Sequence, residues 1–330
     1  MFECVPTVSE LISQRLQQKS QPGFRTDGFK LGLVLESGGM RGVVVGGEVT
    51  GLQALGVDQA IDSIYTVSCG SCAGYYLVSG QGPEGTSIYY NQINNRDFID
   101  LRRLTERKAI DIAFLTYVVM MRRIPLDTSR VLQSTIPVNV YVTDAEDPQP
   151  VLLPSPKDRL DVHDAQYITC RVPSLAGLPI EYFGKDLTDG GVMTGGLPVQ
   201  QAVEDGCSHL LVARSRDEAK VSKTELLVDR LLILAIAVDL EINGYLKLGQ
   251  ALLGVGQRLK ENLNLIKKLQ SDSSFQVQVE VIDLGTSFRN INMIETAGKR
   301  LRQGALDGFQ ATINHFRRLN LPINPAVKII

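Results

Sequence analysis

The chain has no tryptophan and only 10 phenylalanines in 330 residues, and it has no long apolar run. The shortage of large aromatic residues leaves little material for the belts that mark both bilayer interfaces in membrane-spanning proteins. The longest apolar run, from Leu231 to Val238, is far shorter than the ~20 residues that cross a bilayer. We therefore expect a soluble protein without a membrane span.

An excess of charge of one sign is also missing. The 34 lysines and arginines nearly balance the 36 aspartates and glutamates, so the formal net charge is -2 and gives no electrostatic argument for nucleic-acid binding. The five cysteines are odd in number and unevenly spaced, which is not typical of a disulfide framework. The N-terminus lacks the basic and then apolar pattern of a signal peptide, so we expect a cytoplasmic protein.

What the chain does contain is an alternation of strand and helix patterns. Leu31–Leu35 is a continuous apolar run typical of a strand buried on both faces, and a helical pattern follows it. This order predicts an α/β fold with a mostly parallel central sheet flanked by helices. Strands are expected at 31–35, 64–68, 138–142, 151–153, 180–183, 209–213 and 277–284, and helices at 8–18, 43–55, 156–170, 198–205 and 299–318.

The chain shows no internal repeat, low-complexity tract or linker. We therefore expect a polar leader over residues 1–28 and a single domain over residues 29–330, with a helical C-terminal part over about 220–330. Within that part, residues 225–269 predict two helices with a break at 243–244 or at 254–256.

Small residues dominate the stretch that follows the second predicted strand, Ser68-Cys69-Gly70-Ser71-Cys72-Ala73-Gly74. A strand, small residues and then a helix are typical of a nucleophile elbow, in which Gly-x-nucleophile-x-Gly holds one side chain on a strained turn. On this interpretation Cys72 is the nucleophile, and the elbow consists of Gly70, Ser71, Ala73 and Gly74. The same letters contain Cys69-Gly70-Ser71-Cys72, the C-x-x-C of thiol-disulfide oxidoreductases.

Two other glycine-rich stretches accompany this one. Gly38-Gly39-Met40-Arg41 lies between the first strand and its helix, where free backbone N–H groups can face an anion. A plain β–α turn and a dinucleotide loop are the alternatives, and the dinucleotide loop is disfavoured because Gly-x-Gly-x-x-Gly is absent. Asp189-Gly190-Gly191 lies much later, and taken alone it is typical of a tight turn.

In this order the three stretches resemble the signature of the patatin-like phospholipases, most closely the bacterial branch. That signature is Gly-Gly-Gly-x-Arg/Lys-Gly, then Gly-x-Ser-x-Gly, then Asp-Gly-Gly or Asp-Gly-Ala. In this sequence Ser37 replaces the first glycine of the loop, and Cys72 replaces the nucleophilic serine. The resemblance covers roughly residues 30–215 and implies a three-layer patatin-like fold.

The resemblance implies a lipid acyl hydrolase of the phospholipase or carboxylesterase type, with a nucleophile–aspartate dyad and no histidine. Cys72 would attack the ester, and Asp189, in the turn formed by Gly190 and Gly191, would be the base. The expected partner is a lipid or fatty-acyl ester, with peripheral contact at the inner membrane face, no nucleic acid, no metal and no cofactor. The oxyanion would be held by Gly38, Gly39 and Met40, with the charge of Arg41 nearby.

Alternatives to an active hydrolase stay open. A thiol beside an ionised Asp189 would have a raised pKa, which would leave a catalytically impaired, lipid-binding or regulatory protein. Cys69 and Cys72 could instead serve thiol-disulfide exchange, or form a disulfide that switches the esterase off.

Histidines and basic residues are interpreted as structural. His163, His209 and His315 are expected on a helix, at a strand start and on the last helix, and Cys69 and Cys72 have no second Cys/His pair that would complete a metal site. The basic residues within 81–130 are interpreted as solvated helix faces, with a surface for anionic lipid head groups as the alternative. They are Arg102, Arg103, Arg107, Lys108, Arg122 and Arg123.

Overall fold

The computed structural model describes residues 5–271 and 276–329, so residues 1–4 of the predicted leader and residues 272–275 and 330 of the C-terminal part lie outside the described residues. Within this part, the middle layer is an eight-stranded sheet. Its parallel strands follow the order β3-β2-β1-β7-β8. At the β3 edge, β6 pairs antiparallel with β3 and β5 pairs antiparallel with β6. The strands are β1 (Leu31–Leu35), β2 (Ser63–Val67), β3 (Val138–Asp144), β4 (Pro150–Leu152), β5 (Ile180–Tyr182), β6 (Lys185–Asp189), β7 (His209–Ala213) and β8 (Gln278–Val281).

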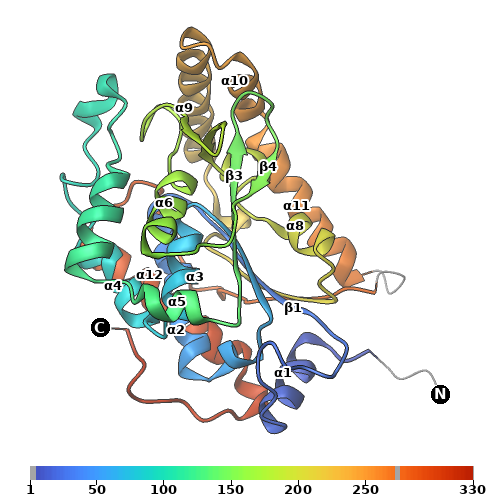
Figure 1. The fold of residues 1–330 in the computed structure, drawn as a ribbon. Helices are drawn as coiled ribbons and strands as arrows, with labels where there is room; N and C mark the ends of the chain where they lie inside the picture. The colour runs from blue at the N-terminus through green and yellow to red at the C-terminus, as the bar shows by residue number, and fades with distance from the viewer. Residues whose placement is uncertain (1–4, 272–275, 330) are drawn as a thin grey trace.

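Helices cover both faces of the sheet, which confirms the predicted α/β architecture (Figure 1). Leu31, Leu33 and Leu35 of β1 pack in one core with α2, while Val34 points to the opposite face and packs in a second core with α8 and α11. This alternation follows from the two-residue period of a strand. On the α2 face lie α1 (Val8–Gln17), α2 (Gly42–Ala54), α3 (Cys69–Val78), α4 (Gly82–Asn91), α5 (Thr128–Gln133), α6 (Arg159–Thr169) and α12 (Gly298–His315), and on the other lie α7 (Gly191–Thr194), α8 (Val199–Glu204) and α11 (Val255–Ser271).

Three features differ from the sequence prediction. The stretch predicted as two helices is three, α9 (Lys223–Ile242), α10 (Leu246–Leu253) and α11, because the chain breaks at both Gly244 and Gly254. Strand β6, which carries Asp189 at its end, was not predicted because its sequence lacks an apolar run. Residues 114–123, expected within a helical region, form a π-helix, η4 (Phe114–Arg123). Such helices are rare and often lie at functional sites.

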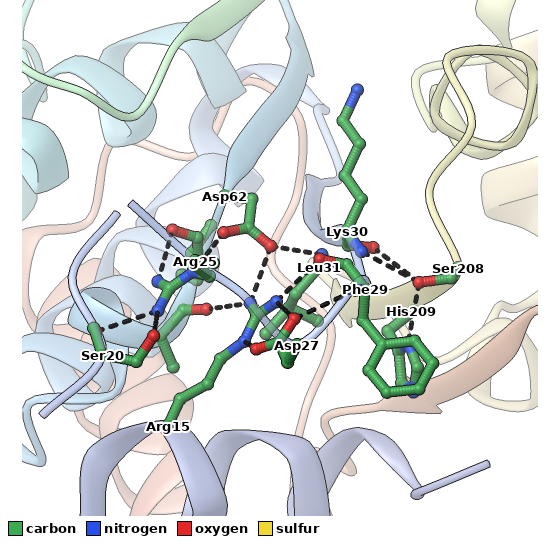
Figure 2. Close-up of polar contacts among 12 residues, drawn as sticks. Arg15, Ser20, Arg25, Asp27, Phe29, Lys30, Leu31, Asp62, Ser208 and His209 are labelled. Carbon is green, nitrogen blue, oxygen red and sulfur yellow. Dashed lines mark hydrogen bonds and ion pairs between the residues drawn. The ribbon is translucent and has the colours of Figure 1, made fainter. Parts of the chain in front are cut away.

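The N-terminal segment, which the sequence predicts to be a polar leader with a short helix, packs that helix into the domain. Val8, Leu11 and Ile12 of α1 are fully buried in the core. Figure 2 shows the buried Arg15, whose guanidinium binds Asp27 at 2.8 Å and Asp62 at 2.7 Å. Because Asp62 also accepts the N–H of Leu31 at the start of β1, this network fixes α1 to the amino end of the sheet.

Helices α2 and α12 are in unusually close contact. A Cβ at Gly47 would overlap the carbonyl oxygen of Ala305, and one at Gly308 would overlap that of Val44. Glycines on both helices therefore let the two backbones meet. This contact holds the C-terminal helix against the helix that follows the glycine loop.

Candidate active site

The candidate site lies at the carboxyl ends of the parallel strands. The chain leaves β1 toward one neighbour, β2, and returns on the other side as β7. Such a change of direction opens a crevice in which α/β proteins bind ligands. The glycine loop follows β1 here, and the small-residue stretch follows β2.

The strained turn after β2 is at Ser68, not at Cys72. Strand β2 ends at Val67 and helix α3 begins at Cys69, so Ser68 is the residue between them. Its backbone has φ 50° and ψ -133°, a conformation that L residues rarely adopt and that marks functional strain. Cys72 lies within α3, and the prediction that it stands at the turn is therefore wrong.

Gly70 and Gly74 allow α3 to lie close to the sheet where it crosses it. A Cβ at Gly70 would lie 2.6 Å from Thr66 Oγ1 and 3.0 Å from the carbonyl oxygen of Leu35. Gly74, one turn later, approaches a side chain of β3 in the same way. Ser71 and Ala73 are buried positions of α3. The residues predicted to form the elbow thus form the first turns of α3, directly after the turn at Ser68.

Asp189 lies beside Ser68, although the two are far apart in the sequence. It ends β6, and its Oδ1 accepts the N–H of Gly191 at 2.7 Å. Burial raises the pKa of Asp189 to about 6, while the nearby Ser68 side chain and the Gly191 N–H lower it. Its Oδ2 is buried and accepts no hydrogen bond of normal geometry from the described residues. A carboxylate oxygen is therefore available next to a strained serine.

The Asp-Gly-Gly turn holds this carboxylate in place. A Cβ at Gly190 would overlap the carbonyl oxygen of Tyr141, and one at Gly191 would lie 2.9 Å from Asp189 Oδ1. The turn therefore requires glycine at position 190, because it is pressed there between the ends of β2 and β3.

The glycine loop faces the same space. Gly38 and Gly39 have φ 156° and 60°, and the Gly38 N–H points at Cys69 Sγ, 3.2 Å away. Both N–H groups lower the pKa of the Cys69 thiol, so both are directed at the position after Ser68. The N–H of Met40 instead donates to the carbonyl oxygen of Met293 at 3.0 Å, which makes the predicted oxyanion role of Met40 wrong.

Arg41 lies behind the loop. A Cβ at Gly38 would overlap the Arg41 Nε, so the guanidinium packs directly against the loop backbone. Burial and the neighbouring Arg216 lower the pKa of Arg41, and Arg41 in turn lowers the pKa of Cys69. The Arg41 charge therefore lies next to the loop, where the sequence interpretation placed it.

An apolar cavity of about 50 Å³ extends from Ser68 into the protein. On the rule of ~10–15 Å³ for each enclosed water, it holds only a few waters. Gly39, Ser68, Cys69 and Met293 contribute to its lining, in which isoleucine is the commonest residue type. The lining includes Ile88, Ile93, Phe98, Ile99, Ile110, Ile112 and Leu115.

The thiols near the site are poorly suited to nucleophilic or redox chemistry. Burial raises the pKa of Cys69 to about 11 and, together with the charge of Cys69, raises that of Cys72 to about 12. Both cysteines are free, as is Cys170, which also lines the cavity. A reactive thiol needs the opposite shift, toward the thiolate.

The histidines have partners elsewhere. His163 Nδ1 lies 2.7 Å from the carbonyl oxygen of Arg159, His209 Nε2 lies 2.8 Å from that of Pro6, and His315 lies 3.1 Å from Glu280. Among residues 5–271 and 276–329, no three His, Cys, Asp or Glu side chains gather as a metal site. In the same residues no helix is long and apolar enough to cross a membrane.

Ser68 is the site residue that the sequence interpretation missed. Thr66-Val67-Ser68-Cys69-Gly70 keeps the serine and the second glycine of Gly-x-Ser-x-Gly, with Thr66 at the first glycine. The signal was the position of Ser68 at the end of a predicted strand, which is where an elbow nucleophile stands.

Comparisons with known proteins agree with the predicted resemblance. A family model described as "Patatin-like phospholipase" matches residues 33–203, slightly more than half of the chain. Among solved structures, the crystal structure of VipD from Legionella pneumophila is similar, with 11% sequence identity and a TM-score of 0.42 over 88% of this chain and 67% of that chain. No curated protein matches this sequence. The family match supports a lipid hydrolase in general.

Proposed function

The chain belongs to the patatin-like phospholipase family, and we propose that it hydrolyses carboxylic esters of lipids with Ser68 as nucleophile and Asp189 as general base. One observation carries the assignment. The strained residue between β2 and α3 is a serine whose side chain lies near enough to the buried carboxylate of Asp189 to lower its pKa, and Oδ2 of that carboxylate has no other partner among the described residues. This replaces Cys72 as the proposed nucleophile.

The proposed reaction has two halves. Ser68 Oγ attacks the ester carbonyl while its proton passes to Asp189. Asp189 then gives that proton to the departing alcohol, which leaves an acyl-serine. Water attacks the acyl-serine, its proton passes to Asp189 and on to Ser68 Oγ, and the fatty acid departs. With its pKa raised to about 6, Asp189 is ionised at neutral pH and close to the optimum for both transfers.

The oxyanion is stabilised by backbone N–H groups. Those of Gly38 and Gly39 converge on the position after Ser68, and the N–H of Cys69 lies at the start of α3, where helical N–H groups lack intrahelical partners. The Cys69 thiol holds these donors in the free protein, and the substrate oxygen would replace it there.

The acyl chain enters the isoleucine-lined cavity. Its lining is apolar and begins at Ser68, as an acyl-enzyme requires. We propose that the protein acts in the cytoplasm and contacts the inner membrane face peripherally, where such esters are found.

Hydrolysis of p-nitrophenyl butyrate by single variants tests the assignment. Ser68→Ala and Asp189→Asn are each expected to lower kcat/KM by at least about 10³-fold, and Cys72→Ala is expected to stay within about 3-fold of the wild type. Thermal unfolding of each variant checks the fold.

Three outcomes would contradict the proposal. Loss of activity in a folded Cys72→Ala protein, with activity kept in Ser68→Ala, would return the nucleophile to Cys72. A wild type inactive on both soluble and vesicle-bound esters would indicate an impaired, lipid-binding member. Insulin reduction that depends on Cys69 would favour thiol-disulfide exchange.

A further inference from the structure

Helix α9 presents a continuous apolar stripe to solvent. Its members are Leu227, Leu231, Leu234, Val238 and Ile242, spaced by three or four residues, with exposed fractions between 47% and 77%. This spacing places them on one face of the helix. We call these five residues the outer stripe. The exposed Leu246 and Leu253 of α10 belong to the same helix pair.

The opposite face of α9 is the one that anchors it to the domain. Ile236 and Leu240 are buried in a core with Ala109 and Leu175. The outer stripe is therefore not needed for folding of this helix pair. Exposed apolar patches of this kind mark interaction sites.

Two acidic residues of α9, Asp239 and Asp229, are paired with arginines of the domain. Asp239 forms a bidentate ion pair with Arg107, at 2.8 and 2.9 Å, and accepts a hydrogen bond from Ser174. Asp229 lies 3.8 Å from Arg216. Among the described side chains of α9 and α10, the exposed charged residues are Lys223, Arg230, Glu241 and Lys247. The charge that accompanies the stripe at the surface is thus mainly positive.

One loop contacts both the helix that carries the stripe and the cavity. Arg107, which binds α9, follows the short helix η3 (Leu101–Glu106), whose Leu101 and Leu104 are also exposed. The loop that carries η3 is closed by pairing of Ile99 with Ile110, and both isoleucines line the cavity. Figure 1 shows α9, α10 and this projecting loop at the same, upper end of the molecule.

We propose that the outer stripe of α9, with the exposed Leu101 and Leu104, inserts into the surface of an anionic lipid bilayer and brings the cavity to its substrate. The inference rests on the proposed function. Apolar side chains flanked by cations are the combination that binds peripheral helices to anionic membranes. A second copy of this chain fits less well, because its identical face would bring the same excess of positive charge.

Binding to vesicles tests this surface without requiring turnover. Ser68→Ala protein is mixed with vesicles of phosphatidylcholine alone or of equal parts phosphatidylcholine and phosphatidylglycerol, and is sedimented. The triple variant combines Leu227→Ser, Leu231→Ser and Leu234→Ser in this background. We expect its partition coefficient between vesicles and water to be at least about 10-fold lower than that of its parent. Arg230→Glu with Lys247→Glu is expected to remove most of the preference for phosphatidylglycerol.

The matched control is Phe24→Ser. Phe24 is 79% exposed, but it precedes β1 and so lies at the opposite end of the sheet from the site. We expect this variant to bind vesicles as its parent does. Two measurements show that the stripe variants are folded. Their unfolding temperatures should be unchanged, and the same substitutions made in the wild-type protein, which keeps Ser68, should leave hydrolysis of soluble p-nitrophenyl butyrate unchanged.

Equal vesicle binding by the triple variant and its parent would overturn the inference. So would a triple variant that changes only the oligomeric state by light scattering, since the stripe would then be an interface between copies. Absence of esterase activity in the wild type would contradict the proposed function but would leave the vesicle measurement interpretable.

Discussion

At the scale of single residues, Asp189 couples activity to stability. Burial raises the pKa of its carboxyl from 3.8 to about 6, so the protonated form, which cannot act as the proposed base, accumulates as the pH falls through 6. We expect kcat/KM for a soluble ester to fall tenfold per pH unit below that value. A profile that stays flat through pH 6 would show that Asp189 is not the base.

The raised pKa of Asp189 also makes the stability of the folded protein depend on pH, and stability changes with pH in the opposite direction to activity. Because the folded pKa lies above the unfolded value, the free energy of unfolding decreases as the pH rises from about 4 to 6 and stays reduced above 6. Asp189→Asn should therefore raise the free energy of unfolding near neutral pH by about 2–3 kcal/mol. Urea denaturation measures this gain, and at about pH 4 the gain should vanish.

The thiols at the site should be inert. Burial raises the pKa values of Cys69, Cys72 and Cys207 to between about 11 and 12. We expect iodoacetamide to label these three at least about 100-fold more slowly in the native than in the denatured protein, as read from peptide masses. Rapid labelling of native Cys69 or Cys72 would contradict this and would revive the thiol-based hypotheses.

At the scale of elements, the contact between α2 and α12 depends on glycine. A methyl group at position 308 would overlap the backbone of Val44, and the two helices would have to separate. We expect Gly308→Ala to lower the free energy of unfolding by about 1–3 kcal/mol or more, measured by urea denaturation.

Gly256→Ala provides the matched comparison for Gly308→Ala. Gly256 lies in α11, and a Cβ added there would meet no other atom within 4 Å, so alanine should be neutral or stabilising by up to about 1 kcal/mol. Equal effects of the two substitutions would mean that helix propensity, and not the close approach of α2 and α12, decides the outcome.

At the scale of the whole molecule, the cavity is too small for a long acyl chain. Its volume of about 50 Å³ requires the surrounding segments to move before such a chain can enter. The lining includes Met293, whose carbonyl oxygen accepts the Met40 N–H, and Leu115 of the π-helix η4.

The small volume of the cavity predicts a dependence on chain length and on the physical state of the substrate. Butyryl esters should be hydrolysed in solution, whereas the rate on long-chain esters should rise steeply once they aggregate or enter vesicles. The rate measured across the solubility limit tests this. Saturation by monomeric long-chain ester below that limit would show that the cavity opens without a lipid surface.

The sequence by itself determined the architecture and the family. Continuous apolar runs predicted β1 and β7 to the residue, because strands buried on both faces need apolar side chains at every position. The order of glycine loop, small-residue stretch and Asp-Gly-Gly predicted the resemblance that the family match confirms. The same order is the basis for proposing Asp189 and the two loop glycines as site residues.

The tertiary structure alone decided which residue stands at the elbow and which donors face the site. Ser68 and Cys72 both lie among small residues, and the local pattern does not fix where a strand ends and a helix begins. The close approach of Gly70 to Thr66 and Leu35 arises only when α3 crosses the sheet, and it leaves no room for a side chain at position 70. The N–H of Met40 is likewise removed from the oxyanion site by Met293, a residue that packing brings there from far along the chain.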